Sequence, residues 1–354
     1  MKKIILILVM ILSIQIPLLA ADLNEMIGQM IIVGFVGDNV KSKGFKEVLK
    51  QVENNEISGV IFFEDNIKNK EEFLKMTSAL KNSKAKYPPF IAIDMEGGYV
   101  QRMNKNNGFK NFKSAKQISK LTEDEAYKEY FEMAKMLKEA DINLNFAPCV
   151  DLAVNKESII EQKERSYSND PKVVVKYAKQ FIKAHEKNNI ITSIKHFPGH
   201  GSPTGDTHLG FVDATKTYSD NELYPYLYLA DVSPLQTVMI SHLYNKNIDK
   251  KYPASLSYQT IEKFLRVQTN FDGVIITDDL DMGAIRKNYD LYEIVSLSIN
   301  AGENILLFSN RFEHDKKLVD KINLAIKRGL VDGYILSDNL VNSYERIIKL
   351  KKCL

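Results

Sequence analysis

Short apolar runs alternate with longer amphipathic stretches along most of the chain. Eight runs carry apolar or β-branched residues at successive positions, which is typical of parallel strands buried on both faces. Between them, charged and apolar residues recur with the period of a helix, as in Glu123–Glu139, Pro171–Lys187 and Ser257–Phe264. The expected strands are Met30–Phe35, Gly59–Phe63, Phe90–Asp94, Asn143–Ala147, Thr192–His196, Val238–His242, Val274–Asp278 and Asn304–Phe308.

Eight strands separated by helices predict an α/β fold, a closed (β/α)₈ TIM barrel rather than an open sheet. No linker rich in Pro, Gly or Ser divides the chain and no internal repeat is present, so we expect a single domain over residues 21–354. A last periodic stretch, Asn339–Lys351, predicts one extra C-terminal helix on the outside of the barrel. The lysine-rich end of that stretch, residues 349–352, is interpreted as a solvated face.

The first 20 residues differ from the rest. Two lysines precede the apolar run Ile4–Ile16, and the small pair Ala20-Ala21 follows it. This layout is typical of a cleaved secretory signal peptide, and the run is short for a membrane span. We expect cleavage after Ala20, with Ala21 as the second choice. The protein is then exported to the periplasm or secreted, and it has no membrane association after cleavage.

Composition excludes some classes of partner and leaves others open. The net charge of +3 includes the two signal-peptide lysines, so the mature chain is nearly neutral and gives no argument for nucleic acid. Only Cys149 and Cys353 are present, so no disulfide framework is expected, although one bridge between them stays open. Tryptophan is absent, so tyrosine and phenylalanine must supply any surface that stacks on a ligand. We expect a monomer without a cofactor.

Charged and imidazole side chains follow four of the expected strands. The third strand ends at Asp94, the fifth in Lys195-His196, the sixth at His242 and the seventh in Asp278-Asp279. In a TIM barrel the carboxyl ends of the strands share one rim, where catalytic groups lie. Strand ends also become polar because loops are solvated. Four such ends on one rim nevertheless favour a functional site.

The end of the fifth expected strand and the loop after it hold three of the chain's six histidines, His196, His200 and His208. A metal site is one alternative, but neither an HExxH helix nor a cysteine pair accompanies these histidines. The spacing Asp206-Thr207-His208 suggests a dyad in which the carboxylate orients the imidazole for proton transfer near neutral pH. A plain surface turn is the other alternative, and spacing alone does not decide between them.

The other histidines receive structural interpretations. We expect His200 to shape its loop and His242 to end its strand, although either could line a pocket. His185 and His314 fall in helical stretches and are expected on the surface.

Several ordered motifs resemble glycoside hydrolase family 3, in particular its β-N-acetylglucosaminidase (beta-hexosaminidase) branch. Lys195–Gly201, followed by Asp206-Thr207-His208, is similar to the KHFPGHG…DxH signature of that branch. The resemblance spans nearly the whole mature chain. Its other matching segments are Asp94–Arg102, Asn145–Asp151, Glu164–Tyr167, Val238–His242 and Phe271–Met282.

The resemblance implies a retaining, two-step hydrolysis of terminal β-linked N-acetylglucosamine (GlcNAc) from peptidoglycan fragments such as muropeptides. By match to the motif, Asp278 is the nucleophile, with Asp279 and Asp281 as rivals. His208 matches the acid/base, and Asp206 matches the carboxylate that holds its tautomer. No metal is implied. The residues to which the resemblance assigns sugar binding are Asp94, Arg102, Arg165, Lys195 and His196.

One departure and three alternatives remain. Tyr99 stands where the family often has arginine, so its ring could stack on a sugar or alter the leaving-group preference.

A GlcNAc phosphorylase is one alternative function, because a neutral imidazole tolerates an anionic acceptor. A β-glucosidase is another, although those enzymes usually carry the acid/base on a second domain that we do not expect here. A non-catalytic peptidoglycan-binding barrel is the third, and the intact Asp206, His208 and Asp278 argue against it. The sequence leaves the aglycone open among anhydro-N-acetylmuramic acid, a muropeptide and a chitin fragment.

Overall fold

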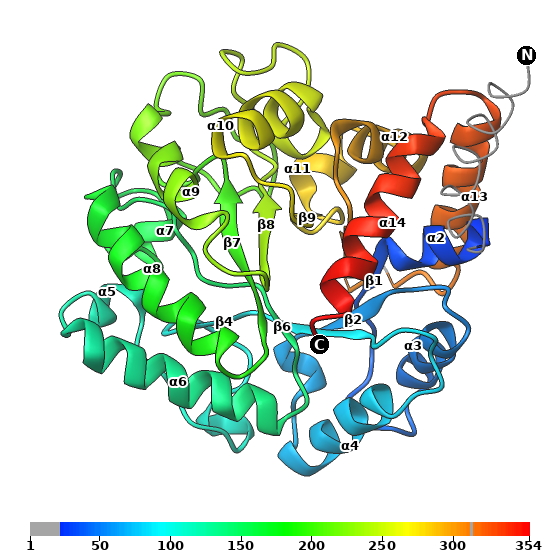
Figure 1. Cartoon of the computed structure of the whole chain (residues 1–354), viewed down its shortest axis with the longest axis horizontal. Helices are drawn as coiled ribbons and strands as arrows, with labels where there is room; N and C mark the ends of the chain where they lie inside the picture. The colour runs from blue at the N-terminus through cyan, green and yellow to red at the C-terminus, as the bar shows by residue number, and fades with distance from the viewer. Residues whose placement is uncertain (1–21, 312–313) are drawn as a thin grey trace, which may run out of the picture.

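Eight parallel strands form the centre of the structure, a computed structural model that describes residues 22–311 and 314–354 (Figure 1). The expected signal peptide, residues 1–20, lies outside the described residues. The strands are β1 (Ile31–Val33), β2 (Gly59–Phe62), β3 (Phe90–Ile93), β6 (Leu144–Asn145), β7 (Ile191–Phe197), β8 (Gln236–Ile240), β9 (Ile275–Thr277) and β10 (Leu306–Phe308).

The strands pair in parallel in the order β10-β1-β2-β3-β6-β7-β8-β9. A further parallel bridge joins Ile276 of β9 to Ile305, which directly precedes β10, so the ends of the sheet meet. Every strand residue is buried, as expected for strands covered by helices outside and by packed side chains inside. The predicted TIM barrel is confirmed, and each of its strands overlaps an expected run.

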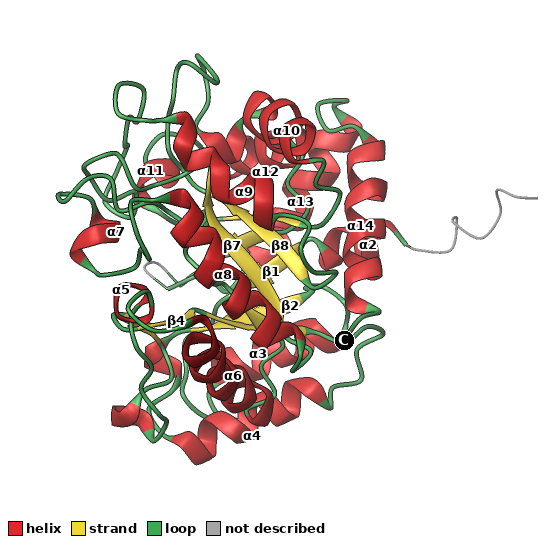
Figure 2. Ribbon diagram, turned by 60° about the vertical axis from the view of Figure 1, so that its left-hand side comes forward, coloured by secondary structure: helices red, strands yellow, loops and turns green. Residues whose placement is uncertain are grey.

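Helices form an outer layer around the strands (Figure 2). None of the helices within the described ranges is long and apolar enough to cross a membrane. The α-helices are α2 (Leu23–Gln29), α3 (Lys43–Glu53), α4 (Lys70–Lys81), α5 (Ala115–Ile118), α6 (Glu123–Glu139), α7 (Ile159–Gln162), α8 (Pro171–Glu186), α9 (Tyr224–Leu229), α10 (Val267–Thr269), α11 (Gly283–Arg286), α12 (Leu291–Ala301), α13 (Leu318–Val331) and α14 (Ser337–Lys351). Short 3₁₀ turns are η2 (Glu64–Asn66), η3 (Lys105–Asn107), η4 (Asp220–Leu223) and η5 (Ala254–Leu256), and η6 (Gln259–Arg266) is π-helical.

Local capping explains where the predicted helices begin. The α6 helix starts after Thr122, which forms a capping box with Glu125. The α8 helix starts with proline at its first position. The preceding residue, Asp170, caps it by accepting a hydrogen bond from the backbone N–H of Lys172. The expected helix Ser257–Phe264 forms as η6, two residues later, because the Ser257 hydroxyl accepts the backbone N–H of Thr260 at 3.0 Å.

An antiparallel hairpin outside the barrel sheet was not predicted. It consists of β4 (Met95–Gly97) and β5 (Val100–Gln101) and follows β3 directly. Gly97 and Gly98 make its turn with φ angles of +95° and +60°, a conformation that favours glycine. The hairpin carries the segment after Asp94 over the rim of the barrel.

The prediction that His185 lies on the surface is wrong. Its imidazole is fully buried on α8 and stacks on Phe181 with ring centroids 3.9 Å apart. Nδ1 lies 2.9 Å from the Phe181 carbonyl oxygen, so Nδ1 carries the proton, and Nε2 accepts from the Asn145 amide at 3.1 Å. Burial lowers the pKa of His185 to about 3 and keeps it neutral. His314 is exposed, as expected, although it lies in a loop.

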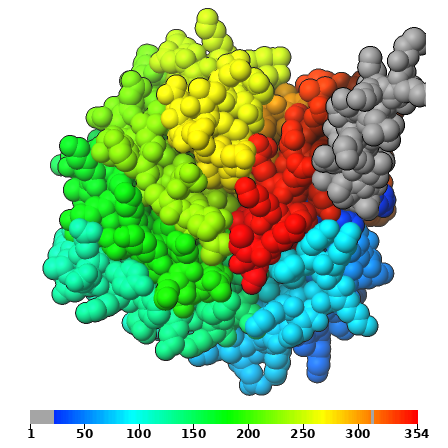
Figure 3. All heavy atoms as spheres, viewed as in Figure 1, coloured from blue at the N-terminus to red at the C-terminus, as the bar shows by residue number. Residues whose placement is uncertain are grey.

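The extra C-terminal helix is confirmed. Figure 3 shows α14, in red, on the surface of the molecule between segments coloured yellow and cyan. The expected solvated lysine face holds for Lys352 but not for Lys351, the last residue of α14, which is only 2% exposed. Lys351 Nζ donates to Gln29 Oε1 at 2.8 Å and to the Ser58 carbonyl at 2.9 Å. These partners lie just before β1 and β2, so the Lys351 side chain packs against the amino-terminal end of the barrel.

The two cysteines form no bridge. Cys149 is a buried free thiol and Cys353 an exposed one. The disulfide that composition left open is therefore absent from the structure.

Replacing Lys351 with methionine is expected to stabilise the fold by about 1–4 kcal/mol at pH 7. Burial holds the pKa of Lys351 well below its ordinary value, so at pH values between the two the unfolded chain binds a proton that the folded chain does not. The free-energy cost of burying Lys351 decreases as the pH rises toward the ordinary lysine pKa of about 10.4. The stabilisation by Lys351→Met should therefore be larger at pH 7 than at pH 10.

Thermal unfolding of Lys351→Met at both pH values measures this, with the exposed Lys352→Met as the matched control. A lower Tm for Lys351→Met would show instead that the hydrogen bonds to Gln29 and Ser58 outweigh the cost of burying an amine.

Candidate active site

A cavity of about 370 Å³ opens at the carboxyl ends of the barrel strands. Apolar side chains on or directly after the strands contribute to its lining, such as Met239 of β8 and Phe146 after β6. A larger cavity of about 640 Å³ lies beside α14 and holds none of the residues predicted to act. The smaller cavity brings together every predicted site residue, namely Asp94, Arg102, Arg165, Lys195, His196, Asp206, His208 and Asp278.

One wall of this cavity is a continuous chain of ion pairs. Lys195 Nζ lies 2.9 Å from Asp94 Oδ1 and 2.8 Å from Glu96 Oε1, so one ammonium bridges two carboxylates. Arg102 Nη2 extends the chain from Asp94 at 3.3 Å. Arg165 closes its other end by holding Glu96 through two hydrogen bonds of 2.8 and 2.9 Å. Paired guanidinium and carboxylate groups of this kind are fixed in direction as well as in charge.

The charges in this wall are stabilised mutually. Burial raises the pKa of Asp94, but the charges of Lys195 and Arg102 outweigh it and hold that pKa at about 2. Burial likewise opposes ionisation of Glu96, yet Arg165 and Lys195 hold its pKa well below the ordinary range. Burial lowers the pKa of Lys195, whereas the two carboxylates raise it above its usual value. All members of the wall are therefore charged near neutral pH.

Glu96 is a member of this wall that the sequence interpretation missed. It lies two residues after Asp94 along an extended segment, so both carboxylates reach the same face. The Asn145 amide fixes that segment by accepting the Met95 N–H at 2.9 Å and donating to the Met95 carbonyl at 3.0 Å. Asn145 is held in turn by buried His185. The spacing of two residues between Asp94 and Glu96 was the sequence feature that could have indicated that both carboxylates belong to the site.

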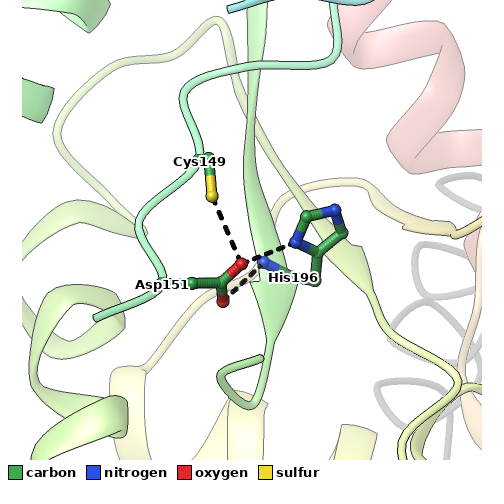
Figure 4. Close-up of side chains that lie close together, drawn as sticks. All are labelled: Cys149, Asp151 and His196. Carbon is green, nitrogen blue, oxygen red and sulfur yellow. Dashed lines mark hydrogen bonds and ion pairs between the residues drawn. The ribbon is translucent and has the colours of Figure 1, made fainter. Parts of the chain in front are cut away.

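Asp151 is the second missed residue, and it sets the state of His196 (Figure 4). Asp151 Oδ2 lies 2.7 Å from His196 Nδ1, while Oδ1 accepts the backbone N–H groups of His196 and His200 at 3.2 and 2.8 Å. Arg165 Nη2 lies 3.2 Å from His196 Nε2. A guanidinium only donates, so Nε2 of His196 accepts this hydrogen bond. Nδ1 therefore carries the ring proton and donates a hydrogen bond to Asp151. His196 thus presents its imidazole in a fixed orientation.

The donor atoms of Cys149, Asp151 and His196 lie within 4.8 Å of one another, a spacing that could hold a metal ion. Both carboxylate oxygens already accept hydrogen bonds, including one from the Cys149 thiol at 3.3 Å. Burial and the Asp151 charge raise the pKa of that thiol well above its usual value, so it stays protonated. These contacts favour an orienting role for Asp151 over a ligand role.

The expected dyad is formed at the mouth of the cavity. Asp206 Oδ1 lies 2.7 Å from His208 Nδ1 and accepts the backbone N–H of His208 at 3.0 Å. Burial raises the pKa of Asp206, but the N–H and imidazole of His208 and the charge of Lys163 bring it below its ordinary value. The His208 side chain is 60% exposed, and its Nε2 has no hydrogen-bond partner within the described part of the chain. This nitrogen is therefore available to a ligand.

Two neighbouring aspartates after β9 differ in their surroundings. Burial raises the pKa of Asp278, yet the imidazoles of His196, His242 and His208 outweigh it and lower that pKa. Asp279 Oδ1 is occupied by the Ser309 N–H at 2.8 Å and the Asp281 N–H at 3.1 Å. Burial and the charge of Asp281 raise the pKa of Asp279 to about 7. Asp278 therefore offers the ionised carboxylate, and Asp279 holds the loops together.

His242 has the structural role expected for it. Its Nε2 lies 2.9 Å from the Asp279 carbonyl oxygen and its Nδ1 lies 2.7 Å from the Ser255 hydroxyl. Because the carbonyl only accepts, Nε2 carries the proton and Nδ1 accepts from the serine. The imidazole thus ties β8 to the turn that follows β9.

Comparisons with known proteins identify the family that the chain resembles. The model of the glycosyl hydrolase family 3 N terminal domain matches residues 22–350. Beta-hexosaminidase A from Pseudoalteromonas piscicida is 29% identical over 95% of this chain, which spans 62% of that protein. A Beta-hexosaminidase from Photobacterium profundum is 33% identical over 78% of this chain and 82% of its own length. A glycoside hydrolase family 3 beta-N-acetylglucosaminidase from Paenibacillus sp. superposes with a TM-score of 0.86 at 26% identity, over 94% of this chain and 63% of that one.

Glu96→Gln is expected to lower the free energy of unfolding by about 3–5 kcal/mol at pH 7, because Arg165 and Lys195 lose a buried partner. The pKa of Glu96 is lowered in the folded state, so the stability that its charge contributes is present above an ordinary glutamate pKa of about 4.3 and is lost as the pH falls below it. The difference in the free energy of unfolding between the wild type and Glu96→Gln should therefore be smaller at pH 3 than at pH 7.

Urea unfolding at pH 7 and pH 3 measures the effect, with Glu71→Gln as the control because Glu71 pairs with Lys75 on the surface of α4. A loss of equal size at both pH values would show that Glu96 acts through packing rather than through charge.

Proposed function

The chain belongs to glycosyl hydrolase family 3, and we propose that it is an exported, retaining β-N-acetylglucosaminidase acting on peptidoglycan fragments. It removes terminal GlcNAc from their non-reducing ends. The observation that carries this proposal is the meeting of an ionised Asp278, the Asp206–His208 dyad and the ion-paired wall in one cavity. The similar proteins are named beta-hexosaminidase and beta-N-acetylglucosaminidase, which supports the choice of sugar.

In the first step, Asp278 attacks the anomeric carbon and the bond from that carbon to the leaving oxygen breaks. His208 donates its Nε2 proton to the departing oxygen, and the negative charge of Asp206 stabilises the imidazolium before transfer. In the second step His208 accepts a proton from water, which attacks the same carbon and releases Asp278. The imidazole is neutral after its first transfer, so it adds no charge beside the incoming nucleophile.

The ion-paired wall binds the hydroxyls of the terminal sugar. Asp94 offers acceptors, while Arg102, Arg165 and Lys195 offer donors. Glu96 does not line the cavity, but its pairing with Arg165 and Lys195 helps to fix where they point. His196 Nε2 lies beside them, 3.2 Å from Arg165 Nη2. A cavity of about 370 Å³ is small for a ligand pocket, which suits removal of one terminal residue.

Export rests on the layout of residues 1–20, with lysines before an apolar run and small residues after it. Sequencing the amino terminus of the mature protein recovered outside the cytoplasm tests this, and a retained Met1 would contradict it.

Turnover of p-nitrophenyl β-N-acetylglucosaminide should exceed turnover of the corresponding glucoside by at least about a hundredfold, and Asp278→Ala should reduce it by about a thousandfold or more. Asp279→Asn is the matched control, because its amide oxygen can still accept from Ser309 and Asp281. If Asp279→Asn were inactive and Asp278→Ala active, the nucleophile would be Asp279. Equal cleavage of the glucoside, or release of sugar phosphate when phosphate is added, would replace this function by one of its alternatives.

His208→Ala should slow substrates with basic leaving groups far more than activated aryl glycosides, because a phenolate departs without protonation whereas a sugar alkoxide does not. A burst of aryl product should appear, since water attack also loses its base. Asp206→Ala should show a milder form of the same pattern. Steady-state and stopped-flow rates across a series of leaving groups measure this. Equal losses for every leaving group would assign His208 a binding role instead.

A further inference from the structure

An aromatic ring and an ammonium stand together at the mouth of the cavity, outside the ion-paired wall. The Tyr99 side chain is 69% exposed yet lines the cavity. Lys163 Nζ lies over this ring, 4.9 Å from its centroid. Both line the same cavity as the Asp206–His208 dyad, so they stand near the group that protonates the leaving oxygen. An exposed ring beside a sugar site is a surface on which a pyranose can stack.

Close packing fixes the backbone turn that carries Tyr99. A Cβ on the preceding residue, Gly98, would lie 2.5 Å from Ser114 Cβ, and one on Gly97 would lie 2.3 Å from the Lys113 carbonyl oxygen. The hairpin turn therefore lies directly against this neighbouring segment. Gln101 also donates to the Gly98 carbonyl at 2.8 Å. The turn presents Tyr99 from one defined position.

The same segment fixes the backbone on either side of Lys163. The Ser114 hydroxyl donates to Glu164 Oε2 at 2.9 Å, and Lys116 Nζ pairs with Glu161 at 2.7 Å. Residues 114–116 thus hold both the hairpin that carries Tyr99 and the end of α7 that precedes Lys163. The two segments that carry the ring and the ammonium are therefore held before any ligand arrives, which limits the backbone entropy lost on binding.

Lys163 also differs from the other cations of the cavity. Arg102, Arg165 and Lys195 are each paired with a carboxylate of the wall. Lys163 makes no ion pair with any residue in the ranges 22–311 and 314–354, and its side chain is partly exposed. It is the cation of this cavity, among those described, whose ammonium has no carboxylate within ion-pair distance, although its charge also acts on Asp206.

We propose that Tyr99 and Lys163 form the subsite for the leaving group and select a sugar that carries a carboxylate. The inference rests on the proposed function and adds the chemistry of the aglycone. The leaving pyranose stacks on the Tyr99 ring, and its carboxylate pairs with the Lys163 ammonium. A neutral leaving sugar, such as the second GlcNAc of a chitin fragment, would use the ring alone.

The test compares kcat/KM for three substrates of the full-length enzyme. They are methyl β-N-acetylglucosaminide, which has no leaving ring, chitobiose, which has a neutral one, and GlcNAc-β-1,4-N-acetylmuramic acid, which has an acidic one. Lys163→Gln should lower the preference for the acidic over the neutral disaccharide by about threefold to fivefold, the size expected for an exposed ion pair. This preference should also weaken in high salt.

Tyr99→Ala should lower the preference for either disaccharide over the methyl glycoside by about tenfold, and Tyr99→Phe should restore it, because stacking needs the ring and not the hydroxyl. Lys110→Gln is the matched control. Lys110 lies over Phe112, 5.0 Å from the ring centroid, and neither residue lines the cavity.

The outcomes separate the two proposals. If the wild type cleaves none of the three substrates, the proposed function fails. If it cleaves all three and Lys163→Gln leaves the acidic preference unchanged, the aglycone inference fails alone. If Lys163→Gln lowers all three rates equally and shifts the pH profile, Lys163 acts through Asp206 and selects no leaving group. If Tyr99→Ala left the preference for either disaccharide over the methyl glycoside unchanged, the leaving sugar would not stack on Tyr99.

Discussion

The Lys195 ammonium, held between the carboxylates of Asp94 and Glu96, is the interaction on which the rest of the site depends. It joins the end of β7 to the segment after β3, and Arg165 extends the connection to the segment after α7. Buried ion pairs contribute little net stability, because desolvation offsets most of their attraction. Their value here lies in direction, since each charged group arrives at the cavity already oriented by a partner.

The same principle separates the acidic groups of the cavity into different roles. Asp94 and Glu96 face cations, and their pKa values lie well below the ordinary range. Asp278 faces imidazoles and stays ionised despite burial, whereas Asp279 faces Asp281 and has its pKa raised to about 7. Neighbouring carboxyl groups thus have different pKa values because their surroundings differ. An ionised nucleophile beside an oriented imidazole is what the proposed two-step reaction requires.

Much of the fold follows from periodicity in the sequence, because barrel strands are buried on both faces and their helices on one. The bounds of α6 match the expected stretch, and all eight strands lie at or beside expected runs. The candidate site could be predicted because its members follow strands, and parallel strands end on one rim. The errors share a different cause. Burial of His185 and Lys351 depends on which segments pack beside a helix, and the parts played by Glu96 and Asp151 depend on contacts between distant segments. Local pattern does not contain that information.

Trapping the covalent intermediate tests the central claim most directly. The enzyme would be incubated with a fluorinated N-acetylglucosaminyl donor, which slows the second step more than the first, and its peptides would be mapped by tandem mass spectrometry. The account predicts one sugar bound through an ester to Asp278. A label on Asp279 or Asp281, or turnover of this donor without any covalent label, would contradict it.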